Sequence, residues 1–113
     1  MSGVPIEITI DFIWEKSQRR EFLITFHAHQ ERKAEGIGIV EIREALSHAE
    51  ILESYPDDPR GASCLVLGLA SRRPLHIVCG RTKTNKLVII TVYRPREPRW
   101  VDPRTRGRKG DQA

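Results

Sequence analysis

The chain has 113 residues, of which 30% are charged and 39% hydrophobic, a length and balance typical of one globular domain and too short for two. No stretch reaches the ~20 apolar residues of a membrane-spanning helix, and the first residues lack the basic start and apolar run of a signal peptide. We therefore expect a cytoplasmic protein without a membrane span, in which Cys64 and Cys79 are buried free thiols.

The positive charge is concentrated at one end of the chain. The formal net charge is +4, yet the first 93 residues carry 12 basic and 12 acidic side chains, whereas the last 20 carry seven and three. We expect a folded domain over residues 1–100 and a basic, disordered tail over residues 101–113, because Pro-, Arg- and Gly-rich segments have little apolar surface to bury. Such a tail favours a polyanion or an acidic partner, and a purely solubilising role is equally compatible with it.

Three helices are expected in the first half of the chain. Residues 5–18 place apolar side chains at helical spacing, although their first part also alternates as a strand would. Residues 28–35 are good helix formers and end at Gly36, a typical C-terminal cap, and residues 39–48 gather apolar side chains on one face. The last two helices should form a short hairpin, whose second helix is too acidic to read DNA.

Extended segments surround and follow these helices. Residues 21–26 are short, apolar and β-prone, and the extended pattern then returns after residue 48. The later strands are expected at residues 51–55, 63–70, 75–81 and 86–93. Because the turns between them are short, they should form an antiparallel meander. The predicted fold class is α+β, with N-terminal helices on one face of a four-stranded antiparallel sheet.

One hairpin can be specified residue by residue. If Thr84 and Asn85 form its turn, His76 lies opposite Tyr93 on the more polar face of the sheet. The other face would then be an apolar set covered by the helices, made of Ile77, Cys79, Val88, Ile90 and Val92. Cys64 could lie across from Cys79 in the neighbouring hairpin.

Few side chains are candidates for chemistry. His27 stands at a strand-to-helix junction, where backbone N–H groups favour anions, His76 lies in an apolar strand, and Tyr93 lies at a strand end. Each of the three could equally brace the fold. The chain has no HExxH motif, no glycine-rich phosphate loop and no nucleophile elbow, so we expect neither a metal nor another cofactor.

An ordered series of short motifs runs through most of the chain. It comprises His27-Ala28, Arg32, Gly36-Ile37, Glu44-Ala45-Leu46, Glu53 to Asp58, Leu67-Gly68, Arg73 to Val78 and Ile90 to Pro95. This series, over residues 21–100, resembles domain-of-unknown-function family 4258, except that Glu35 stands where the family usually has an arginine and Lys33 where it has a methionine. The resemblance implies a fold similar to the RelE-like ribonuclease toxins, which are often encoded beside a small zinc-finger antitoxin.

The resemblance also implies roles for individual residues. Metal-independent RNA cleavage needs a base for the 2′-hydroxyl, an acid for the leaving oxygen and a cation for the phosphorane. His27 and His76 are the candidate base and acid, Arg32 stabilises the phosphate, and Tyr93 donates or orients a proton. The candidate RNA-binding residues are Arg81, Arg94, Arg96 and Arg99.

Three functions remain open at this point. The first is a metal-independent endoribonuclease toxin of a toxin–antitoxin pair, acting on RNA or the ribosome. The second is a non-catalytic module of the same fold that docks an antitoxin or a ribosomal partner, and the third is a folded domain without either function. A close, solvent-accessible cluster of His27, His76 and Tyr93 would favour the first, and an apolar groove with these residues dispersed would favour the second.

Overall fold

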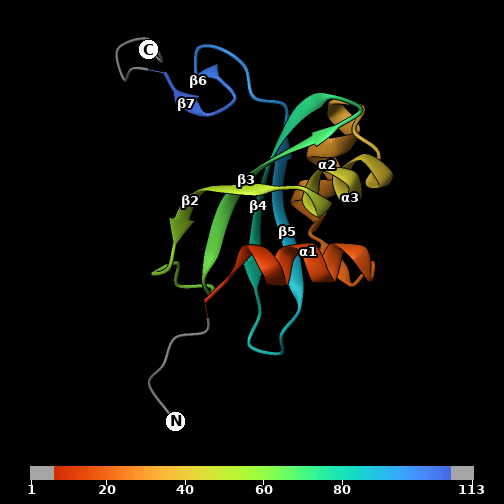
Figure 1. Cartoon of the computed structure of the whole chain (residues 1–113), viewed down its shortest axis with the longest axis vertical. Coiled ribbons are helices and arrows are strands. Elements are labelled where there is room, and N and C mark those ends of the chain that lie inside the picture. Colours follow the sequence, from red (N-terminus) through yellow and green to blue (C-terminus); the bar gives the residue numbers. More distant parts are fainter. Residues whose placement is uncertain (1–6, 108–113) are drawn as a thin grey trace.

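The computed structural model describes residues 7–107, which form three helices, a five-stranded sheet and a two-stranded hairpin (Figure 1). The α+β class is therefore confirmed. In chain order the elements are α1 Ile10–Gln18, β1 Phe22–Ile24, α2 Phe26–Ala34, α3 Ile39–Ser47, β2 Glu50–Tyr55, β3 Ser63–Ala70, β4 Arg73–Arg81, β5 Leu87–Tyr93, β6 Trp100–Asp102 and β7 Thr105–Arg106.

Local capping residues set the limits of the helices. The Thr9 hydroxyl accepts a hydrogen bond from the Phe12 N–H, so α1 begins at Ile10 and is shorter than the expected helix over residues 5–18. Residues 5 and 6 lie outside the described part. The Thr25 hydroxyl caps α2 in the same way, and Gly36 follows that helix with a φ of +68°, as its sequence predicted.

The sheet has five strands, not the four expected. Its order is β1-β5-β4-β3-β2, and every neighbouring pair is antiparallel except β1 and β5, which are parallel. The fifth strand is the short segment between α1 and α2, which pairs with β5 more than 60 residues along the chain. A pairing this distant is decided by packing, because no local turn sets it.

The β4–β5 hairpin departs from the expected register. His76 lies opposite Tyr93 as predicted, but a bulge follows, and Cys79 pairs with Ile89 instead of Ile90. The turn contains three residues instead of two, because the Thr82 N–H donates to the Lys86 carbonyl. The extra residue reverses the faces of β5 before the bulge, so the expectation that Val88 and Ile90 face the helices is wrong, whereas Val92, beyond the bulge, is buried as expected. The buried residues there are Leu87 and Ile89.

The hydrophobic core lies between the helices and one face of the sheet. The sheet contributes Cys64, Val66, Ala70, Leu75, Ile77, Cys79, Leu87, Ile89 and Val92, and the helices contribute Phe12, Ile13, Ala28, Ile42, Ala45 and Leu46. α3 packs closely on β3 because Gly68 has no side chain, since a Cβ atom there would lie 2.0 Å from the Ala45 carbonyl oxygen. Cys64 and Cys79 are buried free thiols facing each other, with 4.0 Å between the sulfur atoms.

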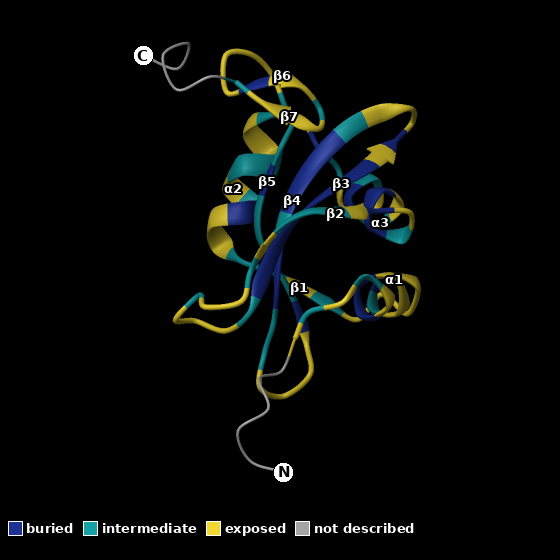
Figure 2. Ribbon diagram, turned by 60° about the vertical axis from the view of Figure 1, so that its left-hand side comes forward, coloured by how far each residue is buried: buried dark blue, intermediate teal, exposed yellow. Residues whose placement is uncertain are grey.

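The C-terminal segment folds back onto the opposite face of the sheet. β6 and β7 form a hairpin at the end of the sheet where β5 stops, with β6 partly buried and β7 exposed (Figures 1 and 2). The Arg104 guanidinium pairs with Glu50, and that of Arg106 with Glu53 at 2.6 Å. The expectation of a disordered tail from residue 101 therefore fails for residues 101–107, because β2 supplies carboxylates to its cations. Residues 108–113 of that expected tail lie outside the described part.

No helix within residues 7–107 has the length and hydrophobicity needed to cross a membrane.

Candidate functional site

His76 and Tyr93 lie side by side, as the predicted register requires. His76 is fully buried, and its Nδ1 lies 3.1 Å from the Tyr93 hydroxyl. Trp100, from β6, stacks edge-on against the imidazole with 4.3 Å between the ring centroids and donates its indole N–H to the Tyr93 oxygen. The Pro103 carbonyl oxygen lies 2.7 Å from His76 Nε2. The C-terminal hairpin thus closes over the pair.

This network determines the protonation of both residues. A carbonyl oxygen only accepts hydrogen bonds, so His76 Nε2 carries the proton and Nδ1 accepts from the Tyr93 hydroxyl. Burial lowers the pKa of His76, and burial also raises the pKa of Tyr93 against the opposing effect of the Trp100 N–H. Both groups are therefore held neutral, and transfer of a proton from tyrosine to histidine is disfavoured.

Tyr93 also lines a pocket of about 300 Å³ that we call the arginine pocket. It is formed by Glu35, Tyr93, Arg94, Arg96, Glu97, Pro98, Arg99 and Trp100. Four residues chosen from the sequence therefore meet here: the candidate catalytic tyrosine and three of the candidate RNA-binding arginines. His76 does not line the pocket and reaches it only through the hydroxyl of Tyr93.

Carboxylates hold two of these arginines in place. Arg94 pairs with Glu41 at 3.2 Å, and Arg96 pairs with Glu35, whose second oxygen accepts from the Arg94 backbone N–H. The Arg94 guanidinium keeps one buried nitrogen, Nη1, without a hydrogen-bond partner among residues 7–107. An unsatisfied buried donor costs ~1–3 kcal/mol, so an acceptor oxygen brought to this nitrogen would be bound favourably.

The segment that identifies the family forms part of the arginine pocket. Residues 24–94 match the family described as "Domain of unknown function (DUF4258)". The chain belongs to this family. The match includes Glu35, His76, Tyr93 and Arg94 and ends before the C-terminal hairpin. No curated protein and no solved structure matches the chain.

In the DUF4258 domain, His27 lies apart from His76 and Tyr93. His27 is on the first turn of α2, with 66% of its side chain exposed, and its Nε2 lies 3.4 Å from Glu31. Glu31 in turn accepts from the Val92 N–H, which ties α2 along β5. Glu35 follows the C-terminal end of the same helix, ~12 Å further along its axis. The expected cluster of two histidines and a tyrosine is therefore not formed.

Arg32 and Arg81 also lie outside the arginine pocket. The Arg32 guanidinium donates to His29 Nδ1 and to the Ile37 carbonyl, so it braces the connection between α2 and α3. The Arg81 guanidinium donates to the Asn85 side chain and lies 4.4 Å over the ring of Phe12. Both arginines make contacts that stabilise the fold, at sites away from the tyrosine.

Sequence reasoning missed two features of the pocket. Glu35 was noted only as a departure from the family pattern, whereas it lies beside Tyr93 and the arginines. Trp100 is interpreted from the sequence as an apolar anchor at the boundary of the tail, and the structure adds that it is 2% exposed and covers His76. The run of prolines and arginines around Trp100 signals neither role, because both depend on the fold of the hairpin.

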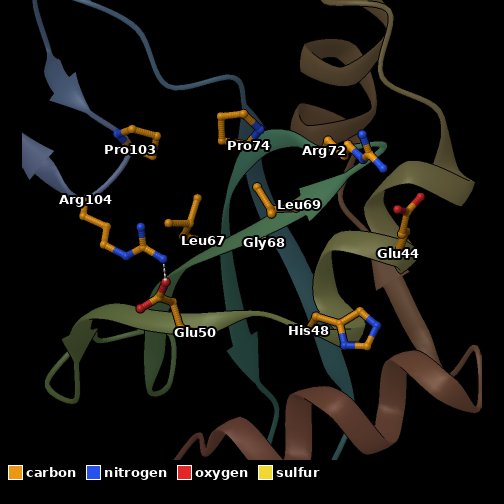
Figure 3. Close-up of a pocket in the computed structure, with 10 residues that line it drawn as sticks. All are labelled: Glu44, His48, Glu50, Leu67, Gly68, Leu69, Arg72, Pro74, Pro103 and Arg104. Atoms are coloured by element: carbon orange, nitrogen blue, oxygen red, sulfur yellow. Dashed lines mark hydrogen bonds and ion pairs between the residues drawn. The ribbon is translucent and has the colours of Figure 1, made fainter.

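A second, larger pocket of about 500 Å³ lies between α3, the turn from β3 to β4, and the C-terminal hairpin (Figure 3). Glu50 and Arg104 pair on one side, and His48 and Glu44 lie on the α3 side. Glu44 accepts from the Ser71 N–H, so its carboxylate anchors the turn. Within residues 7–107, no three His, Cys, Asp or Glu side chains are grouped as a metal site.

Proposed function

We propose that this DUF4258 protein is a metal-independent endoribonuclease toxin with a RelE-like fold, acting on RNA in the cytoplasm and paired with a small zinc-finger antitoxin. The observation that supports this function best is the convergence of Tyr93 with Arg94, Arg96 and Arg99 in one pocket. Arginine is suited to phosphate because its planar guanidinium offers paired donors. A neighbouring phenol supplies a proton donor at the same place.

The arginine pocket has the donors that an RNA phosphate requires. Arg99 is exposed, Arg96 is tied to Glu35 by one nitrogen, and Arg94 keeps the unpartnered Nη1. A phosphate oxygen that reached this buried nitrogen would complete the hydrogen bonding of Arg94. Since these contacts are made to the phosphates of the RNA backbone, RNA binding should be largely independent of base sequence and should weaken as the salt concentration rises.

The acid and base of the reaction are reassigned from the sequence-based hypothesis. His76 is buried and cannot touch RNA, so we assign it a positioning role, holding the Tyr93 hydroxyl in place. Tyr93 becomes the general acid and the Glu35 carboxylate the general base, because both line the pocket. Burial raises the pKa of Tyr93, and the Trp100 N–H, Arg106 and Arg99 oppose that rise, so these three groups would stabilise the phenolate formed when Tyr93 gives up its proton.

The proposed step is an in-line attack within one strand. Glu35 takes the proton of the 2′-hydroxyl, the 2′-oxygen bonds to phosphorus, and the bond from phosphorus to the 5′-oxygen breaks. The Tyr93 hydroxyl turns from His76 Nδ1 and gives its proton to that leaving oxygen, while the arginines stabilise the charge on the phosphorane. The products are a 2′,3′-cyclic phosphate and a 5′-hydroxyl, and water returns the proton from Glu35 to Tyr93.

The test is cleavage of a labelled single-stranded RNA by the full chain in EDTA. We expect products that end in a 2′,3′-cyclic phosphate, and we expect Glu35→Gln and Tyr93→Phe each to slow cleavage by ~10²–10⁴-fold. Glu97→Gln is the matched control, because Glu97 lines the same pocket but is exposed. Absence of cleavage by the wild type, or equal loss in the control, would reject the assignment.

A second function is favoured by the burial of His76 and by its separation from His27, the arrangement expected of a binding module. This histidine is hydrogen-bonded through both ring nitrogens, which is typical of a structural residue. We therefore keep as an alternative a non-catalytic module that docks an antitoxin or a ribosomal partner. Expressing the chain with and without the neighbouring reading frame separates the two. Growth inhibition with intact RNA supports the module, and inhibition with cyclic-phosphate fragments supports the ribonuclease.

A further inference from the structure

A groove on the side of the molecule that carries β1 is built for a different ligand. It has a volume of about 560 Å³ and lies between β1, the end of α1 and the first turn of α3. Its apolar walls are exposed: 54% of Leu23, 44% of Ile39 and 77% of Val40 are accessible. Large aliphatic side chains grouped in this way mark an interaction surface more often than a monomer's ordinary surface.

The strand beside this groove has a free edge. Among the strands of residues 7–107, β1 is outermost in the sheet and pairs with β5 alone. Within residues 7–107, no hydrogen bond joins its other edge to another segment. Unpaired N–H and C=O groups on an edge strand are a template for a further strand, so the groove can hold an extended peptide whose alternate side chains enter the apolar cavity.

The charged residues of the groove all favour a negative ligand. Arg20 and Arg43 line it, and within the described residues no carboxylate does. The Arg43 guanidinium is held at the end of α1 by bonds to the Ser17 and Gln18 carbonyls, and Arg20 is exposed with no side-chain partner in residues 7–107. His29 also lines the groove, and because its Nδ1 accepts from Arg32, its Nε2 is a donor.

From these features we propose that the groove docks an extended, acidic segment of another protein, with β-branched or aliphatic residues alternating with carboxylates. A second copy of this chain is a poor occupant, because it would bring the same arginines together. The remaining ends of this chain, residues 1–6 and 108–113, contain one acidic residue, Asp111, beside two basic ones. The inference does not depend on the proposed ribonuclease, which uses another pocket.

The test uses capped seven-residue peptides in which valine alternates with glutamate, added to the isotope-labelled full chain. We expect amide signals of Phe22 to Ile24 and of Ile39 to Arg43 to shift with the glutamate peptide. The matched lysine peptide should bind at least about tenfold more weakly, the change expected for a charge reversal. A peptide with a central proline should also lose binding, because proline cannot donate to the edge of β1.

Two variants and one control sharpen this experiment. Arg20→Glu should abolish the preference for the glutamate peptide, because the new carboxylate offsets the charge of Arg43. Val40→Asp should weaken binding of the glutamate peptide by about tenfold without harming α3, since acidic residues suit a first helical turn. Arg72→Glu is the control, because Arg72 is also exposed with a positive φ but lies away from the groove. Shifts outside the groove, equal binding of both peptides, or dimerisation through Val40 would each overturn the proposal. RNA cleavage is measured in a separate experiment, so failure of peptide binding would not reject the proposed ribonuclease, nor the reverse.

Discussion

The two faces of the sheet are covered in different ways. On one face, α1, α2 and α3 bury aliphatic side chains such as Ile42 and Leu46, which are fully inaccessible. On the other face, the C-terminal hairpin closes through Trp100, the hydrogen bonds of His76 and ion pairs to β2. The stabilisation gained from burying apolar side chains changes little with salt or pH, whereas that from ion pairs and hydrogen bonds to titratable groups changes with both. Changes in salt or pH should therefore weaken the packing of the C-terminal hairpin more than the packing of the helices.

The largest effect should come from the helix face. Leu46→Ala removes a fully buried side chain from the core and should lower the free energy of unfolding by ~2–5 kcal/mol. Urea denaturation at low and at high salt measures this decrease in the free energy of unfolding. The decrease should be the same at the two salt concentrations. Leu69→Ala is a control for leucine removal, because Leu69 is 53% exposed. A loss from Leu46→Ala that changed strongly with salt would contradict the comparison.

An intermediate effect should come from the buried histidine. The pKa of His76 is lowered by burial, so below its ordinary value of 6.5 the unfolded chain binds a proton that the folded chain does not. This contribution to stability should therefore be fully present above about pH 6.5 and should decrease as the pH falls below it. His76→Gln, which keeps hydrogen-bonding groups without titrating, should remove this step. His48→Gln, at an exposed histidine, should retain it.

The smallest effect should come from a single ion pair of the hairpin. The Arg106 guanidinium lowers the pKa of Glu53 from 4.5 to about 2, so this pair stabilises the fold above about pH 4.5 and is lost as the pH falls toward 2. Arg106→Gln should cost ~0.2–1 kcal/mol at neutral pH and low salt, and much less in 1 M salt.

Arg60→Gln is a suitable comparison for this ion pair, because Arg60 pairs with Asp58 within one loop and joins no two elements. Thermal melts over a range of salt and pH distinguish the two. If Arg106→Gln lowered stability equally at all salt concentrations, packing of Arg106 on the Trp100 ring, at 4.7 Å, would be its main contribution.

Predictions from the sequence were most accurate where neighbouring residues decide the structure. Gly36 ends α2 as predicted, and the predicted segment over residues 63–70 coincides with β3. The pairing of His76 with Tyr93 followed from counting away from a turn, and it survived an error in that turn because the bulge in β5 compensated for the longer loop. These features depend on local hydrogen bonds and on alternation of side chains.

The candidate site was predicted only in part, because it depends on contacts between distant segments. The sequence alone identified Tyr93 and the arginines after it as chemically suitable residues, since their side-chain chemistry does not depend on the fold. The tertiary structure decided that Trp100 buries His76, that Glu35 joins the arginine pocket and that His27 stays apart. Burial and charge pairing arise where separate segments meet, and short-range sequence patterns do not encode those meetings.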